Sequence, residues 1–275
     1  MIEREETVIR PPAALAHLDL RALYRYRHLM WSMVRKRVRL DLGDMYLGFF
    51  WAIARPLAML GIFVFVRDFS GADMHVTISY PLYLYSGLIL WFHFRETVMA
   101  AARSFVKDAG IMKKVYYPRL ISPIVPVVAR LNTLAIAMVP LILLMFWHST
   151  YPNWRIILLP LVLLQCMILV LGVGIIVACL SLTKKDPEKA LNLCLYLGLF
   201  VSPVIFAPDM IPQRGRIVYF LNPMAGTLLA FRSSLFHDFP FPLWQFAYSS
   251  AMSLLLFTIS ILVFRRVEIY IADKL

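Results

Sequence analysis

Six long apolar runs recur along this chain of 275 residues. They cover residues 47–66, 80–102, 120–147, 156–182, 190–207 and 243–264. A helix of about 20 apolar residues is long enough to span the hydrocarbon core of a bilayer. The sequence therefore predicts an all-α integral membrane protein with six transmembrane helices.

The composition agrees with this class and excludes several others. The chain is 61% hydrophobic and 16% charged, with a mean hydropathy of +0.73. Soluble domains are about 45–50% apolar and about 25% charged. A soluble enzyme, a disordered chain and a secreted disulfide scaffold are excluded. Cys166, Cys179 and Cys194 all lie in apolar runs, and we interpret them as small buried hydrophobic residues.

Basic residues are distributed unevenly between the predicted loops. If the N-terminus is cytoplasmic, 20 Lys and Arg residues fall on the cytoplasmic side and 5 on the opposite side. Because cytoplasmic loops collect Lys and Arg, both termini are predicted to be cytoplasmic. This topology also accounts for the formal net charge of +12, so no nucleic-acid partner is expected.

Three regions follow from this topology. Residues 1–46 form a cytoplasmic N-terminus, 47–264 the six-helix transmembrane domain, and 265–275 a cytoplasmic tail. In residues 19–42 apolar and basic positions alternate, which predicts an amphipathic helix in the membrane interface. The alternative is a solvated basic tail that only enforces topology.

Residues 208–240 do not fit a single straight span. They contain four prolines and two glycines, yet they remain apolar. Irregular backbone at membrane depth is tolerated only where protein or a cavity covers it. The region therefore predicts two short re-entrant helices between spans five and six, beside a cavity on the outer side.

Four charged residues lie inside the predicted spans: Arg55, Arg95, Glu96 and Arg130. Charges in a bilayer are costly, so each arginine is either functional or extends its charged end to the cytoplasmic surface. Arg95 and Glu96 point about 100° apart on one helix and do not pair well. Pro56 follows Arg55 and predicts a kink, beside which the cation would admit an anionic head group.

Aromatic residues cluster in two of the spans. Tyr80, Tyr83, Tyr85, Trp91 and Phe92 lie in the second, and Tyr196, Phe200 and Phe206 lie in or next to the fifth. One interpretation is the aromatic belt of a membrane interface. The other is a surface on which sugar rings stack.

Motifs for chemistry within the chain are absent. The sequence has no Walker A phosphate-binding loop, no H-E-x-x-H and no glycine-rich dinucleotide turn. Its six histidines are scattered, and Glu96 is the single acidic residue inside the spans. We expect no catalytic residue, no metal and no cofactor here, but a pore protein with a separate energy source.

Several short motifs resemble those of bacterial polysaccharide ABC-exporter permeases, in order and at similar spacing from about residue 20 onward. They are Leu47-Gly48-Phe49-Phe50-Trp51-Ala52 with Arg55-Pro56-Leu57, Ser86-Gly87-Leu88-Ile89-Leu90-Trp91, Ile111-Met112-Lys113-Lys114-Val115-Tyr116-Tyr117-Pro118-Arg119, Ser202-Pro203-Val204-Ile205-Phe206, Leu221-Asn222-Pro223-Met224, Phe231-Arg232 and Phe264-Arg265-Arg266-Val267-Glu268.

The resemblance implies a homodimer in the bacterial plasma membrane with two copies of an ATP-binding subunit, where ATP and magnesium would bind. The cargo would be a polyprenyl-diphosphate-linked glycan, such as O-antigen, teichoic acid, capsule or galactan, and the O-antigen and teichoic-acid branch is the most similar. Arg95, Glu96 and Arg130 depart from the pattern and would belong to an ion-pair network between the two copies.

Site roles follow from the resemblance and from the residue chemistry together. Access of the lipid diphosphate is assigned to Arg37, Arg39, Leu47, Gly48 and Arg55. Coupling to the ATPase is assigned, within the loop 104–119, to Ser104, Lys107, Asp108, Lys113, Lys114 and Tyr116. The glycan path and gate are assigned to Tyr85, Trp91, Phe92, Tyr196, Phe200, Phe206, Asn222 and Pro223.

Three alternatives stay open. One is an ABC permease for a drug or a simple lipid, against which the motifs at 111–119 and 202–224 argue. Another is an integral-membrane enzyme acting on polyprenyl phosphates, which is disfavoured because the cytoplasmic carboxylates lie singly or in loose pairs. The third is a channel or secondary carrier, which usually requires coupling carboxylates in its spans.

Overall fold

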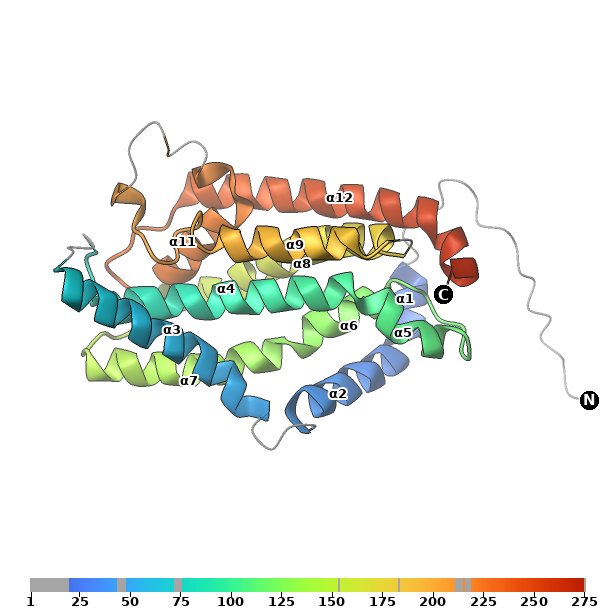
Figure 1. Cartoon of the computed structure of the whole chain (residues 1–275), viewed down its shortest axis with the longest axis horizontal. Helices are drawn as coiled ribbons and strands as arrows, with labels where there is room; N and C mark the ends of the chain where they lie inside the picture. The colour runs from blue at the N-terminus through green and yellow to red at the C-terminus, as the bar shows by residue number, and fades with distance from the viewer. Residues whose placement is uncertain are drawn as a thin grey trace, which may run out of the picture.

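All described elements of this chain are helices (Figure 1). A computed structural model describes residues 20–43, 48–71, 76–152, 154–182, 184–210, 215 and 219–274. In chain order the elements are α1 (Leu20–Arg25), α2 (Arg27–Gly43), α3 (Gly48–Ser70), α4 (Tyr80–Ala102), α5 (Ser104–Met112), α6 (Ile121–Ala129), α7 (Leu131–Trp147), the 3-10 helix η1 (Trp154–Leu158), α8 (Leu159–Leu180), α9 (Asp186–Gly198), the 3-10 helix η2 (Pro208–Met210), α11 (Pro223–Leu235) and α12 (Leu243–Lys274).

Helix α4 lies at the centre of the bundle and matches the predicted span 80–102 residue for residue. Pro81 stands in its first turn, where a missing N–H costs nothing. Nineteen of its 23 residues are buried, by contacts with α3, α6, α7, α8, α9 and α11. A helix buried all round is surrounded by protein, so α4 is the internal scaffold on which the site is built.

Helices α8 and α12 pack closely along much of their length. A Cβ on Gly172 would lie 2.9 Å from the backbone nitrogen of Phe257, so only glycine permits this approach. Polar side chains join the same pair: the amide Nε2 of Gln165 donates to Ser253 Oγ at 2.8 Å. Small residues and hydrogen bonds of this kind are how helices associate inside membranes.

Four helical segments are long and apolar enough to cross a bilayer: Phe50–Ser70, Ile121–Trp147, Trp154–Leu180 and Leu243–Glu268. The fifth predicted run, 190–207, is not one helix. Helix α9 ends at Gly198, and residues 199–205 form turns, because Pro203 disfavours helical backbone at Ser202. With 13 residues, α9 is about 20 Å long and too short to span alone. Six spans therefore stay a prediction.

The predicted interfacial segment folds as α1 and α2, separated by a turn at Tyr26. The apolar side of α2, including Val34, packs on Tyr117, Ile121 and Val125 at the start of α6. This face is thus covered by protein, and the basic face is the one that points outward. Because α6 offers a matching hydrophobic surface, α2 packs this face on protein, and the position of the helix in the membrane interface stays a prediction.

The region 208–240 is only partly described, since residues 211–214 and 216–218 lie outside the described residues. Its best-described element is α11, a buried helix between α8, α12 and α4. Asn222 caps α11: its side-chain oxygen accepts from Met224 N at 3.0 Å, and its Nδ2 donates to Ser202 Oγ at 2.7 Å. The pair of re-entrant helices stays a prediction.

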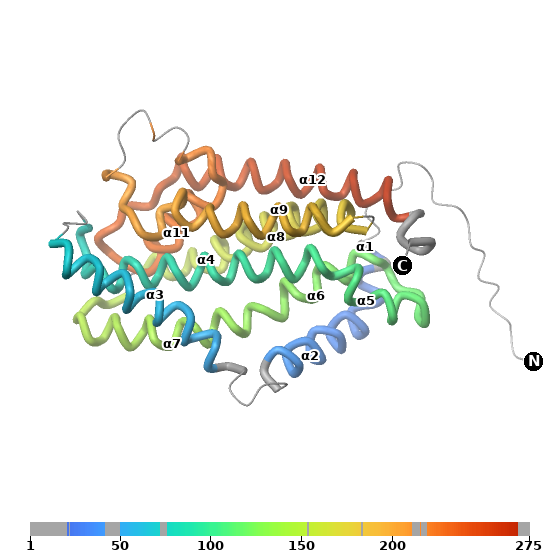
Figure 2. Tube along the Cα trace, in the orientation of Figure 1, coloured from blue at the N-terminus to red at the C-terminus, as the bar shows by residue number. Residues whose placement is uncertain are grey.

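The connecting segments separate onto the two ends of the bundle (Figure 2). α1, α5 and the end of α12 gather at one end, which we call the basic end. The segments before α4, after α7 and before α12 lie at the opposite end. Which end faces the cytoplasm stays a prediction from the charge distribution.

Candidate functional site

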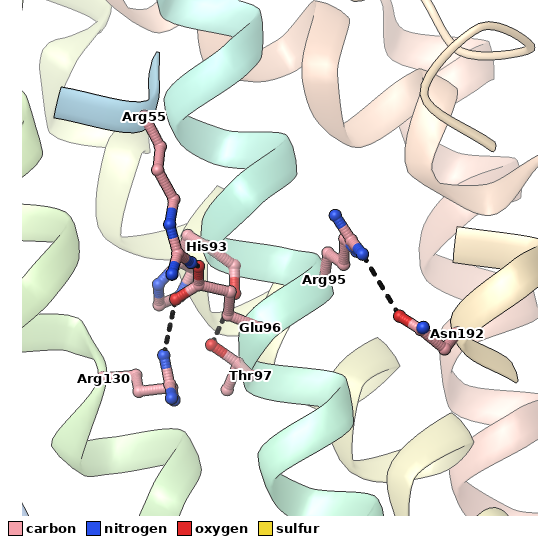
Figure 3. Close-up of polar contacts among 7 residues, drawn as sticks. All are labelled: Arg55, His93, Arg95, Glu96, Thr97, Arg130 and Asn192. Carbon is pink, nitrogen blue, oxygen red and sulfur yellow. Dashed lines mark hydrogen bonds and ion pairs between the residues drawn. The ribbon is translucent and has the colours of Figure 1, made fainter. Parts of the chain in front are cut away.

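Glu96 on α4 lies between two arginines from other helices (Figure 3). Arg55 Nη1 on α3 lies 2.7 Å from Glu96 Oε1, and Arg130 Nη1, at the junction of α6 and α7, lies 2.8 Å from Glu96 Oε2. Each carboxylate oxygen therefore accepts from a different guanidinium. We call these three residues the ion-pair triad. It connects three segments that are distant in sequence.

The triad explains how three intramembrane charges are accommodated. An unpaired charge at membrane depth is costly, whereas a paired and hydrogen-bonded one is tolerated. These pairs form within one chain, so the network between copies that the sequence analysis expected is not needed for them. Arg95 points away from the triad, as its spacing predicted, and donates to Asn192 Oδ1 on α9 at 3.2 Å (Figure 3).

A cavity of about 870 Å³ opens beside the triad. It reaches from Asp41 on α2 to Asn192 on α9. Its basic lining residues are Arg55, Arg95, Arg103, Lys107 and Arg130, and its acidic ones are Asp41 and Glu96. We call this space the basic cavity. With five cations against two carboxylates in its lining, it attracts anions.

The cations of the basic cavity are only partly neutralised. Arg103 Nε donates to Glu188 Oε1 on α9 at 2.6 Å. Burial lowers the pKa of Lys107, and the charges of Arg37, Arg103 and Arg130 lower it further, while Asp41 opposes them. A lysine pKa lowered by neighbouring arginines indicates local crowding of positive charge. An anionic ligand would relieve that crowding.

Arg130 also carries an unused donor. Its Nε is buried and has no hydrogen-bond partner among the described residues. His93, one turn before Glu96 on α4, has a buried Nδ1 in the same situation. His93 and Glu96 together line a small pocket of about 30 Å³ that also touches Arg55. Buried polar atoms without partners are rare in folded proteins, so these two atoms beside the cavity could each accept or donate a further hydrogen bond.

The residues predicted for diphosphate access are only partly brought together. Arg55 lines the basic cavity, and Arg37 lies near enough to act on Lys107. Arg39 does not line the basic cavity and lies instead in a groove on α2 with Trp31 and Arg35. Leu47 lies outside the described residues, and Gly48 begins α3.

The predicted coupling residues divide between two faces. Ser104 is buried at the start of α5, and Lys107 lines the basic cavity. Asp108 is half-buried, and burial raises the pKa of its carboxyl, although the Ser122 hydroxyl and Arg37 oppose this. Lys113, Lys114 and Tyr116 follow on the exposed side, where the Tyr116 side chain is 85% exposed.

The aromatic residues predicted for the glycan path do not form one surface. Tyr85 is fully buried and donates its hydroxyl to Ala137 O at 3.1 Å, and Trp91 is buried beside Gly198. Phe92 is half-buried at the small pocket. The remaining aromatic residues of that prediction are exposed: Tyr196, Phe200 and Phe206. In this conformation Tyr85 and Trp91 pack the core rather than offering a stacking face.

Arg232 on α11 is a fully buried cation that the sequence analysis noted only as part of a motif. Its guanidinium donates to the carbonyls of Tyr83 at 2.9 Å and Val204 at 3.0 Å, and also to Pro203 O. It lies 3.5 Å over the Tyr83 ring. A Cβ on Gly87 would clash with Arg232 Nη2, so the two motifs that contain Gly87 and Arg232 form one structural unit.

Within the described part of the chain, no group of His, Cys, Asp and Glu is placed to hold a metal ion. The signal for the basic cavity was present in the sequence, as charges within and just after apolar runs. Arg103 was missed as a lining residue because the cavity that it shares with Arg130 depends on how α4 and α6 pack.

Comparison with known proteins places these features in a family. Residues 28–236 match the model of the ABC-2 type transporter family. The O-antigen export system permease protein RfbA of Myxococcus xanthus is 26% identical over 225 residues, which cover 81% of this chain and 85% of that protein. A Klebsiella pneumoniae protein of the same name is 27% identical over 209 residues, covering 74% and 78%.

A third relative is the polysialic acid transport protein KpsM of Escherichia coli. It is 28% identical over 202 residues, covering 70% of this chain and 75% of that protein. The family match contains the triad, the basic cavity and Arg232. Together with its long apolar helices, this match makes the chain a multi-pass membrane protein that belongs to the ABC-2 type transporter family.

Proposed function

We propose that this chain is the permease subunit of an ATP-driven exporter for a polyprenyl-diphosphate-linked polysaccharide. O-antigen or a teichoic-acid-like polymer is the expected cargo, and the bacterial plasma membrane is the expected location. The similar proteins are named for O-antigen export and polysialic acid transport. The proposal carries that cargo class to this chain.

The basic cavity is the observation that carries the proposal. A lipid-linked diphosphate combines a multiply charged head group with an apolar tail. Arginine binds phosphoryl oxygens in pairs of parallel hydrogen bonds, and the cavity lining offers four arginines and one lysine. The lining also contains Trp51, Ala52 and Met99, so apolar surface adjoins the cations. A soluble nucleotide lacks the long lipid tail that would cover the apolar residues. A neutral drug lacks the negative charge that would pair with the cations.

Energy would come from a partner subunit. Membership of the ABC-2 family implies an ABC ATP-binding partner, where ATP and magnesium bind. We assign the docking surface to the exposed residues after α5, which include Lys113, Lys114 and Tyr116. Two permease copies with two ATP-binding subunits would form the transporter, with the basic end and both termini in the cytoplasm.

The expected cycle uses this geometry without covalent chemistry in the chain. The diphosphate reaches the basic cavity from the cytoplasmic surface, attracted by its cations. ATP binding closes the partner subunits, and α5 transmits that motion to α4 and α6, which it contacts. The glycan then moves outward between the two copies. Exposed Tyr196, Phe200 and Phe206 would line its path, and the region 208–240 would limit leakage.

The test is transport by the reconstituted two-subunit complex in proteoliposomes. Lipid-linked glycan is expected to stimulate ATP hydrolysis, and Arg103→Gln is expected to reduce stimulation at least about tenfold. The matched control is Arg67→Gln at the opposite end of the bundle, which is expected to leave stimulation within about twofold of wild type.

Three outcomes would overturn the proposal. Stimulation by a drug or a simple phospholipid without any response to lipid-linked glycan would favour a different ABC permease. Processing of a polyprenyl phosphate by the chain alone would identify an integral-membrane enzyme. Substrate movement driven by an ion gradient without ATP would indicate a secondary carrier.

A further inference from the structure

Glu96 is a carboxylate placed among the cations that would otherwise receive an anionic ligand. We propose that Glu96 is an internal counter-anion: it occupies the anion position of the basic cavity when the cavity is empty, and a diphosphate must displace it to bind. The identity of the ligand rests on the proposed function. The role of Glu96 rests on the geometry of the triad.

The geometry places the carboxylate where a ligand would bind. Both oxygens of Glu96 are used, one by Arg55 and one by Arg130, at 2.7 and 2.8 Å. All three residues also line the basic cavity. The Arg55 side chain is 61% exposed and that of Glu96 is 36% exposed, so a ligand in the cavity can reach the pair.

The charges favour exchange for a more highly charged anion. One carboxylate faces two guanidiniums, so the triad retains one positive charge. Arg95, Arg103 and Lys107 add further cations to the same cavity. A diphosphate brings at least two negative charges and more acceptor oxygens than a carboxylate. It therefore satisfies more donors than Glu96 does, including Arg130 Nε, which has no partner among the described residues.

The same competition sets a threshold for ligand charge. An anion with a single charge, such as the head group of a monoanionic phospholipid, gains little by replacing a carboxylate that is already held in place. A diphosphate gains more, because it can contact both arginines and leave charge for the other cations. Glu96 would thus exclude the abundant monoanionic lipids of the membrane from the cavity.

Displacement also has a structural consequence. The triad links α3 and the α6–α7 junction to the central helix α4 (Figure 3). When a diphosphate takes both arginines, Glu96 is released, and the direct polar link to α4 is replaced by one through the ligand. Ligand binding would thereby loosen α3 from α4 before the partner subunits close.

The proposal is tested by measuring pyrophosphate and orthophosphate affinity of the full-length chain in nanodiscs of neutral lipid. The ATP-binding subunit is left out, since its nucleotide site would also bind pyrophosphate. Glu96→Gln removes the competing charge and retains the size of the side chain. It is expected to tighten pyrophosphate binding about five- to tenfold and to reduce the preference for pyrophosphate over orthophosphate.

The matched control is Glu188→Gln. Glu188 also pairs with a cavity arginine, Arg103, but does not line the cavity. The control raises the local positive charge equally without vacating the anion position, so its affinity is expected to change less than about twofold. Equal tightening in both variants would mean a general electrostatic effect and would overturn the counter-anion role.

Unchanged or weaker pyrophosphate binding by a folded Glu96→Gln variant would also overturn the counter-anion role. That result is expected if Glu96 only holds the helices together and does not compete with the ligand. If Glu96→Gln does not fold, Glu96→Asp provides the test. The shorter aspartate side chain contacts Arg55 and Arg130 less closely than glutamate does. Pyrophosphate binding is therefore expected to tighten by an intermediate amount, and unchanged binding contradicts the proposal.

Failure of this inference and failure of the proposed function give different results. Absence of pyrophosphate binding in wild type and all variants overturns the counter-anion role. The exporter assignment is judged separately, by glycan-stimulated ATP hydrolysis of the two-subunit complex, which does not depend on the pyrophosphate result.

Discussion

Arg232 shows at the residue scale how this fold holds a buried cation. Its donors meet the carbonyl of Tyr83 in the first turn of α4 and the carbonyls of Pro203 and Val204 in the turns after α9, where irregular backbone leaves carbonyls without helical partners. The guanidinium therefore joins α4, α11 and residues 203–204. Gly87 provides the space that this arrangement needs.

We expect Gly87→Ala to destabilise the chain. The added Cβ would clash with Arg232 Nη2 and lie 3.1 Å from Val204 Cα, which is backbone and cannot move easily. Overpacking of this kind costs about 1–3 kcal/mol, so the apparent melting temperature in detergent should fall by several degrees.

Gly61→Ala is the matched control for this prediction. A Cβ at Gly61, which also lies inside a long helix, has nothing within 4 Å. Its melting temperature is expected to be equal to or slightly higher than that of wild type, since alanine favours helix. Equal losses in both variants would contradict the role given to Gly87.

Helix α5 illustrates the element scale, because one short helix serves two surfaces. One side, with Ser104 and Phe105, is buried in the bundle. The other side, and the residues that follow it, present Val106, Val115 and Tyr116 to the exterior. An element that is anchored on one side and exposed on the other can transmit motion from a partner to the bundle.

Tyr116→Ala should uncouple the two subunits without harming the fold. The Tyr116 side chain is 85% exposed, so its removal is expected to leave the melting temperature of the permease unchanged. An exposed aromatic residue at an interface contributes about 2 kcal/mol or more, so co-purification of the ATP-binding subunit should weaken at least tenfold. Undiminished co-purification and ATP hydrolysis would place the docking surface elsewhere.

Asp108→Asn should change how stability depends on pH. Burial raises the pKa of Asp108, so the folded protein binds that proton more tightly than the unfolded chain. Ionised Asp108 therefore lowers stability as pH rises from the acidic range to neutrality. The variant is expected to lose this dependence and to melt higher than wild type near pH 7, but not near pH 4.

Thermal melts of both proteins from pH 4 to pH 8 check this prediction. A lower melting temperature of the variant at neutral pH would mean that the hydrogen bond from Ser122 and the charge of Arg37 outweigh burial.

The whole molecule is polarised along its long axis. The basic end carries α1, α5 and the end of α12, and the opposite end carries the turns around α11 and between α7 and η1. The positive-inside rule predicts that the basic end faces the cytoplasm.

Cysteine labelling tests that orientation in a background in which Cys166, Cys179 and Cys194 are replaced by serine. A membrane-impermeant reagent applied to intact cells is expected to label Tyr151→Cys and Asp238→Cys. It is expected to label Lys113→Cys and Lys185→Cys only after the cells are opened. All four positions are exposed. The reverse pattern would contradict cytoplasmic termini.

The sequence by itself determined the helical class, the membrane location, the bounds of α4 and the resemblance that family membership later confirmed. These follow from local and additive properties, namely the length of apolar runs, the presence of prolines and the count of cations in loops. A run of 23 residues such as 80–102 specifies its helix wherever its neighbours lie.

Tertiary structure alone decided which partners meet. It paired Arg55 and Arg130 with Glu96, and it packed the apolar face of α2 on α6. It also gave Arg232 its carbonyl partners. Each of these depends on contacts between segments far apart in the chain, and an ion pair or a buried face is defined only when the helices that form it have packed.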